Sequence, residues 1–165
     1  MFTTLSAMVV AVSMTLPSAS VFGATYSEEL QDAYEWAHSK SITTMNSIDE
    51  ANMYGAITRA EMAKMLANWA KNVKGQTPNT SKTCSFTDTS SVGGDLGVAI
   101  TEACQLGLMG QGITAFRPYD TISRAEFGTA LSRALWGDEY EGGNPYYANH
   151  LNALKAAGIM NQIAN

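Results

Sequence analysis

Two arginines in matching contexts are the residues of this sequence best suited to binding chemistry. Residues 57–66 read ITRAEMAKML and residues 122–131 read ISRAEFGTAL, so Arg59 and Arg124 each follow a hydroxyl residue and precede Ala-Glu. An arginine there lies beside the positive end of the helix dipole, where an acidic residue would be favoured. A guanidinium and the amides of a helix N-terminus can together bind a carboxylate or phosphate. The alternative is an internal ion pair, for example between Arg124 and Asp120.

Catalytic chemistry finds little support in the sequence. It contains no G-x-S-x-G, H-E-x-x-H or phosphate-loop motif. His38 and His150 fall on separate predicted helices without a cysteine or an acidic cluster, and we interpret both as surface or groove residues. Glu61 and Glu126 are a candidate glycosidase pair, but both are explained by helix capping. We therefore predict a protein that is not an enzyme and that uses no cofactor or metal.

The hydroxyl residues and glutamates around each arginine form a helix-start signal. In a capping box, a hydroxyl accepts a hydrogen bond from the third helical amide while a glutamate there accepts one from the cap amide. The sequence holds two such pairs, Thr58 with Glu61 and Ser123 with Glu126. Apolar residues then recur at helical spacing, and the second helix is predicted from Ser123 to about Trp136. Trp36 and Trp136 fit the apolar faces poorly, and they are candidates to support a ligand by stacking on sugar rings.

Both arginine segments belong to a longer internal repeat. A different helix is predicted before each of them. The apolar and small residues of the helix around Cys104 have counterparts at the positions 66 residues earlier and 51 residues later. Gly107 and Gly158 follow two of these helices, where a left-handed residue is needed. The repeat unit is therefore a helix, a stop, a loop and a second helix, with two full units and the first half of a third.

The first 24 residues have the layout of a signal peptide. They carry no charged side chain, and an apolar run over 5–16 is followed by Pro17 and a small-residue cleavage site after Ala24. The run is too short for a membrane span of about 20 apolar residues. A buried core helix is the alternative. We predict an exported protein that does not insert into a membrane once the signal is removed.

Charge and cysteine content narrow the class of partner. The formal net charge is −5, which argues against nucleic acid and anionic membranes, since both favour basic patches. Cys84 and Cys104 predict one disulfide in an exported chain. Metal ligation is the alternative, but two thiols without a neighbouring histidine do not complete a tetrahedral site.

Residues 85–135 resemble a surface-layer homology (SLH) repeat. They contain a Phe-x-Asp opening at Phe86 and Asp88, a helix ending in Gly-Leu-Met-Gly, a Phe-x-Pro at Phe116 and Pro118, and Ile-Ser-Arg-Ala-Glu. The first unit resembles the family mainly in ITRAEMAKML, and the third unit mainly in its first helix. The family's usual tryptophan early in the first helix is absent from the middle unit, and the third unit stops before a second helix.

The resemblance implies a mainly α fold of helix–loop–helix units packed as a pseudo-threefold bundle, here with an incomplete third unit. It also implies a noncatalytic cell-surface anchoring module that binds an anionic, often pyruvylated, cell-wall polysaccharide in grooves between repeats, with Arg59 and Arg124 contacting the acidic group. We expect Arg124, in the better formed middle unit, to line the better groove. The alternative is a structural or adhesive surface-layer protein that self-associates through its repeats.

The chain is accordingly divided into five parts, and the protein is placed at the cell wall. The parts are a signal peptide (1–24), a degenerate first repeat (25–73), a linker (74–83), a second repeat (84–137) and the start of a truncated third repeat (138–165). The missing basic residue before the apolar run and the unfinished third unit both indicate a fragment of a longer native chain. The partner we expect is cell-wall polysaccharide.

Overall fold

The computed structural model describes residues 25–163, which form five α-helices and no strand. The helices are α1 (Glu28–Ser39), α2 (Arg59–Asn72), α3 (Gly94–Gln105), α4 (Arg124–Trp136) and α5 (Ala148–Ala156). The prediction of a mainly α protein is confirmed. The predicted signal peptide over 1–24 lies outside the described residues.

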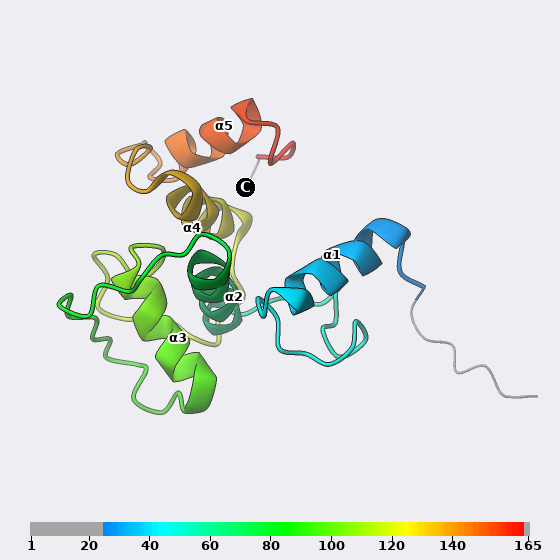
Figure 1. Ribbon diagram of the computed structural model, residues 1–165. Coiled ribbons are helices and arrows are strands. Elements are labelled where there is room, and N and C mark those ends of the chain that lie inside the picture. Colours follow the sequence, from blue (N-terminus) through cyan, green and yellow to red (C-terminus); the bar gives the residue numbers. More distant parts are fainter. Residues whose placement is uncertain (1–24, 164–165) are drawn as a thin grey trace, which may run out of the picture.

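Four of the helices form a stack, and α1 stands apart from it. α3 packs against α2, α5 packs against α4, and α2 contacts α4. Figure 1 shows α3, α2, α4 and α5 following one another from bottom to top, with α1 to one side. Within the described residues, α1 packs closely against no other helix, and it contains no buried residue. The stable body of the protein is therefore the stack.

The main core lies between α2, α3 and the loop that follows α3. Ile100 of α3 and the loop residues Leu108 and Phe116 are its largest fully buried side chains. α2 lines this core with four small residues that are completely buried: Ala60, Ala63, Ala67 and Ala70. Small side chains on the contact face let neighbouring elements approach closely, and close packing maximises the apolar surface removed from water.

α2 and α4 both begin with a complete capping box. In α4 the Ser123 hydroxyl accepts from the Glu126 amide at 3.2 Å, while the Glu126 carboxylate accepts from the Ser123 amide at 2.9 Å. In α2 the same two bonds join Thr58 and Glu61 at 3.3 and 2.7 Å. α4 runs from Arg124 to Trp136, as the apolar spacing predicts.

The two cap segments also hold each other. Thr58 and Thr121 form an isolated antiparallel bridge, and the Ile122 amide donates to the Ile57 carbonyl at 3.1 Å. The start of α2 is thereby fixed to the loop that leads into α4.

Ser123→Ala is expected to lower the free energy of unfolding by about 1 kcal/mol, because the change removes the hydroxyl that caps a packed helix. Urea unfolding followed by circular dichroism measures it. Ser27→Ala is the matched control: Ser27 caps α1 by accepting from the Leu30 amide at 3.3 Å, but α1 contains no buried residue. Equal losses in the two variants would contradict the assignment of α4 to the stable core.

Left-handed residues end three of the helices. Gly107 after α3 and Gly158 after α5 have φ of 80° and 71°, as predicted for residues that stop a helix in this way. Ser41 after α1 has φ of 54°, although it carries a side chain. These three positions are equivalent to one another in the alignment of the predicted repeat.

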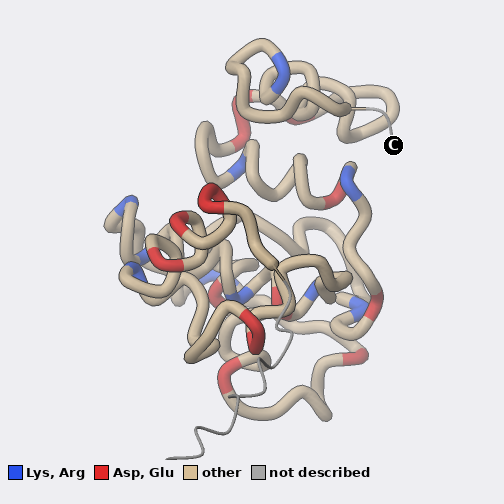
Figure 2. The backbone as a smooth tube through the Cα atoms, turned by 90° about the vertical axis from the view of Figure 1, so that its right-hand side faces the viewer, with Lys and Arg blue, Asp and Glu red and all other residues tan. Residues whose placement is uncertain are grey.

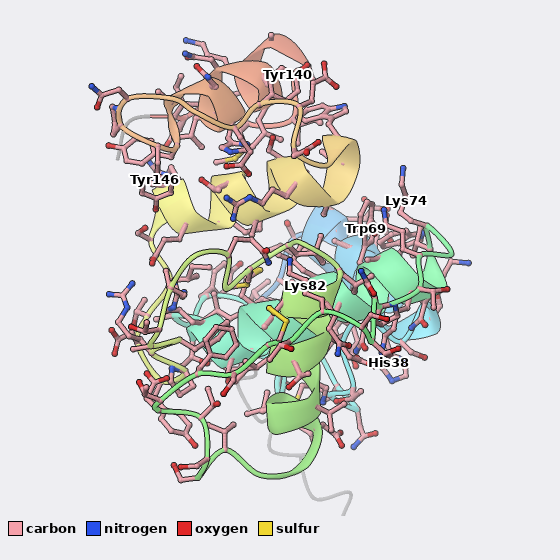
Figure 3. The ribbon with its side chains drawn as sticks, turned by 90° about the vertical axis from the view of Figure 1, so that its left-hand side faces the viewer. His38, Trp69, Lys74, Lys82, Tyr140 and Tyr146 are labelled. Atoms are coloured by element: carbon pink, nitrogen blue, oxygen red, sulfur yellow. A yellow bond between two sulfur atoms is a disulfide. The ribbon has the colours of Figure 1, made fainter. Side chains whose placement is uncertain are left out.

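The predicted disulfide is confirmed. Cys84 and Cys104 are joined with an S–S distance of 2.04 Å, and Figure 3 shows this bond beside α3. It ties the segment that precedes α3 to the C-terminal end of this helix. Closing a loop of this length contributes on the order of 3 kcal/mol.

Charged residues of both signs are distributed over the described chain. Figure 2 shows lysine and arginine positions interspersed with aspartate and glutamate positions along the backbone. Among residues 25–163, no helix has the length and apolar character that a membrane crossing needs.

Candidate functional site

Three arginines meet in a pocket of about 430 Å³ at the junction of α2, α4, the loop after α3 and the segment before α5. We call it the arginine pocket. Its charged lining residues are Arg59, Arg117, Arg133, Glu126 and Glu141. Three guanidinium groups against two carboxylates leave the lining with one net positive charge, in a protein whose net charge is −5.

Arg59 forms the inner wall of the pocket. It is buried, its Nε donates to the Phe116 carbonyl at 2.7 Å, and its guanidinium lies over the Phe116 ring, 5.1 Å from the centroid. Its Nη1 pairs with a Glu126 carboxylate oxygen. Arg59 is therefore held by internal partners on several sides.

The N-terminus of α2 is also occupied by the protein itself. The Arg59 amide donates to the Asp120 carbonyl at 2.9 Å, and the Ala60 amide donates to the Pro118 carbonyl at 2.9 Å. The expectation that these amides and the Arg59 guanidinium converge on an external anion is therefore wrong for α2. The loop over 116–120 folds across the helix start and takes the place of such an anion.

Glu126 has two separate roles, one for each carboxylate oxygen. Oε2 accepts from the Ser123 amide and hydroxyl at 2.9 and 3.0 Å, and so caps α4. Oε1 accepts from Arg59 and, at 2.8 Å, from Nη2 of Arg117. Burial opposes ionisation of this carboxyl, but the Ser123 amide and the two guanidinium groups outweigh it and lower the pKa of Glu126.

Arg117 is the most open of the three arginines, with 54% of its side chain exposed. Its backbone has φ of 58°, an uncommon conformation for a residue that is not glycine and that precedes a proline. Such strained residues persist only where the surroundings fix them, and they occur preferentially at functional sites. Asp120 lies 3.6 Å from its guanidinium.

Asp88 fixes this strained turn. Its two carboxylate oxygens accept from the backbone amides of Phe116 and Arg117 at 2.8 and 2.7 Å. Desolvation works against ionisation, but these two hydrogen bonds outweigh it and lower the pKa of Asp88. Phe86, two residues earlier, packs its ring 5.3 Å from that of Phe116. Phe86 and Asp88 thus position the turn that carries Arg117.

Arg133 closes the opposite side of the pocket. Both its Nε and its Nη2 donate to the carboxylate of Glu141, the latter at 3.0 Å. Hydrogen bonds from Arg133 are the main cause of the lowered pKa of Glu141. This bidentate pair joins α4 to the segment that leads into α5.

His150 lies behind this pair, in the contact between α4 and α5. It is fully buried, its Nδ1 is 2.9 Å from the Ser132 hydroxyl, and its Nε2 is 3.6 Å from Glu141. Our interpretation of His150 as a surface or groove residue is therefore wrong. Burial lowers the pKa of the imidazole, so the ring is neutral at physiological pH. His38, in contrast, is exposed on α1.

An exposed aromatic ring lies at the rim of the pocket. Tyr146 lines it and is 53% exposed, and Figure 3 shows Tyr146 beside the N-terminal half of α4. Tyr147 supports this ring edge-on, with 5.2 Å between the centroids. Burial and the nearby Glu126 carboxylate raise the pKa of Tyr146, so its hydroxyl remains a hydrogen-bond donor. Gln111, from the turn after α3, adds a polar side chain to the lining.

The other residues predicted to bind ligand lie elsewhere. Arg124 is exposed at the start of α4 and does not line the arginine pocket, and Asp120 contacts Arg117. Arg124 therefore has no part in the lining of the arginine pocket, and its role in ligand binding stays a prediction. Trp36 lines a separate apolar groove, and Trp136 packs edge-on against Tyr140 with centroids 5.3 Å apart.

Sequence reasoning did not identify three of the residues that define the pocket. Arg117, Arg133 and Tyr146 come from a loop, a helix and a second loop, and no local spacing connects them. One signal was available for Arg117, because a charged residue stands between Phe116 and Pro118 in the Phe-x-Pro motif.

Comparison with known proteins adds no identification. No family model, no curated protein and no solved structure matches the chain significantly.

Proposed function

We propose that the protein is a noncatalytic module that binds an anionic polysaccharide of the cell wall in the arginine pocket, and so stays at the cell surface after export. The observation that carries this proposal is a pocket lined by three arginines on an acidic protein, with the Arg117 side chain 54% exposed. Arginine suits such a ligand, because its planar guanidinium donates two parallel hydrogen bonds to a carboxylate.

The pocket also offers what a sugar needs besides charge. Tyr146 presents an exposed ring at the rim, on which a sugar can stack, and its hydroxyl can donate to the hydroxyls of the sugar. Pockets of this kind combine apolar walls with a few placed polar groups that orient the ligand. In this proposal Arg59 shapes the inner wall and holds Glu126, and Arg133 holds Glu141 on the opposite side. Arg117, the most exposed of the three arginines, meets the acidic group.

The proposal includes the architecture that the sequence resemblance implies. The five helices are assigned to SLH-like units, with α1 and α2 in the first, α3 and α4 in the second, and α5 opening the third. Support comes from the two matching capping boxes and from left-handed residues at the aligned positions Ser41, Gly107 and Gly158. The arginine pocket then lies where parts of all three units meet.

Co-sedimentation with purified wall sacculi tests the proposed function. The protein should sediment with intact sacculi and stay in solution when the anionic polymer has been stripped from them. Retention on stripped sacculi equal to that on intact sacculi would contradict anionic polysaccharide as the ligand.

Arg117→Asn is expected to weaken sedimentation with sacculi by at least about tenfold, because it removes an exposed guanidinium that can pair with the acidic group of the polysaccharide. Asparagine tolerates the left-handed backbone at this position, so the turn is retained. The matched control is Arg124→Asn, which removes an exposed arginine that lies outside the pocket. An Arg117→Asn protein that is folded by circular dichroism and binds like the wild type would refute the assigned role of Arg117.

A further inference from the structure

Arg133 lines the arginine pocket, but two of its donor atoms are occupied by Glu141. Nε and Nη2 both donate to this carboxylate, and only 17% of the Arg133 side chain is exposed. An acidic sugar would offer the same guanidinium the same bidentate partner. Glu141 therefore takes the place on Arg133 that the acidic group of a ligand would take.

His150 lies within reach of the same carboxylate. Its ring is completely buried, and its Nδ1 is 2.9 Å from the Ser132 hydroxyl. Its Nε2 has no hydrogen-bond partner and lies 3.6 Å from Oε1 of Glu141, the oxygen that accepts from Nε of Arg133. The two charged groups that face the ring are Glu141, from the segment before α5, and Arg133, from α4. A buried polar atom without a partner is uncommon and calls for an explanation.

A protonated His150 would compete with Arg133 for Glu141. The imidazolium donates from both ring nitrogens, and Glu141 is the carboxylate within reach of Nε2. Two cations then share one carboxylate, and their mutual repulsion favours a state in which Arg133 pairs with an anion in the pocket.

The surroundings of Glu141 allow this exchange. The Glu141 side chain is 43% exposed, and Gly142 follows it with φ of 85°, so the carboxylate can approach the imidazole without a change in the core. Burial lowers the pKa of His150 and so keeps the ring neutral at physiological pH. The exchange is therefore expected in mildly acidic surroundings.

We propose that Arg133 is a second contact for the acidic group of the polysaccharide, held by Glu141 at neutral pH and released when His150 is protonated. This inference rests on the proposed function of the arginine pocket. Binding of the anion and binding of the proton are then coupled, and each strengthens the other by the same factor. The protein should accordingly hold the wall more tightly in mildly acidic surroundings than at neutral pH.

The release of Arg133 is tested without ligand, by nuclear magnetic resonance of the protein labelled with ¹⁵N. Between about pH 7.5 and about pH 5 histidine is the side chain that ordinarily titrates. The ring signals of His150 and the Nε–H signal of Arg133 should shift with one common midpoint. The Nε–H signal of Arg59, which donates to the Phe116 carbonyl at 2.7 Å, is the control and should not follow it. A His150 ring that stays neutral throughout, or an Arg133 signal that does not follow it, would overturn the inference.

Calorimetric titration with the acidic polysaccharide released from purified sacculi measures the coupling. The wild type should bind at least about tenfold more tightly at about pH 5 than at about pH 7.5, where carboxylates are ionised at both values. Glu141→Gln removes the charge that holds Arg133 and should bind at least about tenfold more tightly than the wild type at the higher pH. Glu139→Gln removes the same charge from an exposed position outside the pocket and should bind like the wild type.

Histidine variants locate the proton. His150→Asn keeps a polar side chain beside Ser132 but cannot be protonated, so it should abolish the pH dependence, whereas His38→Asn on the exposed part of α1 should retain it. Because Glu141 is partly exposed, Glu141→Gln tests the inference independently of the buried histidine.

The outcomes separate this inference from the proposed function. Equal affinity of the wild type at the two pH values, or Glu141→Gln binding no more tightly than Glu139→Gln, would overturn the inference and leave the proposed function intact. Absence of binding at both pH values would contradict the proposed function, and with it the ligand contact assigned to Arg133.

Discussion

Phe116→Ala is expected to lower the free energy of unfolding by about 3–5 kcal/mol, the range measured when a buried phenylalanine is truncated to alanine. The Phe116 side chain is completely buried, packs against Phe86 and lies beneath the Arg59 guanidinium. Truncation would leave a cavity in the main core and remove the aromatic face on which Arg59 lies. The loss should therefore fall at the upper end of what single core substitutions give.

Urea unfolding followed by circular dichroism measures this loss. Ile113→Ala, a change in the same loop, is the control: Ile113 is 41% exposed, so its truncation should cost about 0.5 kcal/mol or less. A loss for Phe116→Ala no larger than that for Ile113→Ala would show that the loop after α3 is not part of the core.

Arg59→Met is expected to lower the free energy of unfolding by about 3 kcal/mol, near the lower end of the range for removing one partner of a buried ion pair. The side chains of Arg59 and Glu126 are 7% and 19% exposed, so the change leaves a carboxylate with reduced access to water. Arg117 still contacts Glu126 at 2.8 Å, and this limits the loss. Methionine keeps much of the apolar contact with Phe116.

A double-mutant cycle separates this charge effect from lost packing. Adding Glu126→Gln to Arg59→Met removes the uncompensated carboxylate while a glutamine at this position keeps the capping box, so the double variant should recover about 1–2 kcal/mol of the loss. The exposed counterpart Arg124→Met should cost about 0.5 kcal/mol or less. Equal costs for the two arginines would contradict the internal role assigned to Arg59.

The contribution of the ion pair has a defined pH dependence. Because the pKa of Glu126 is lowered in the folded protein, the stabilisation is complete above the ordinary glutamate pKa. It is lost as the pH falls through the lowered value, since the carboxylate must then be protonated in the folded state as well.

Local signals in the sequence were sufficient for the helix starts and stops. The hydroxyl and glutamate of each capping box, the apolar spacing that follows, and the glycines after α3 and α5 act within a few residues of one another, so α4 begins and ends where its spacing predicts. The disulfide was predictable for a different reason, because a chain expected to be exported contained two cysteines and no competing ligand set.

The pocket could not be predicted, because it depends on contacts between distant segments. The sequence assigns Glu126 to a helix cap. It does not reveal that the second carboxylate oxygen accepts a hydrogen bond from Arg59, which lies 67 positions earlier in the chain. The left-handed Arg117 before a proline contradicts local preference, and it exists because Asp88 accepts both amides of the turn. His150 was misjudged since its polarity suggested exposure, whereas Ser132 on the facing helix satisfies one ring nitrogen.

Calorimetric titration of the protein with two matched wall polysaccharides tests the central claim most directly. One polymer keeps its acidic substituents, and the other has had them removed chemically while its sugar backbone is unchanged. The account predicts saturable binding of the acidic polymer that weakens with added salt, and no measurable binding of the neutral one. Equal affinity for the two polymers would contradict the proposal that the arginine pocket recognises an anionic wall polysaccharide.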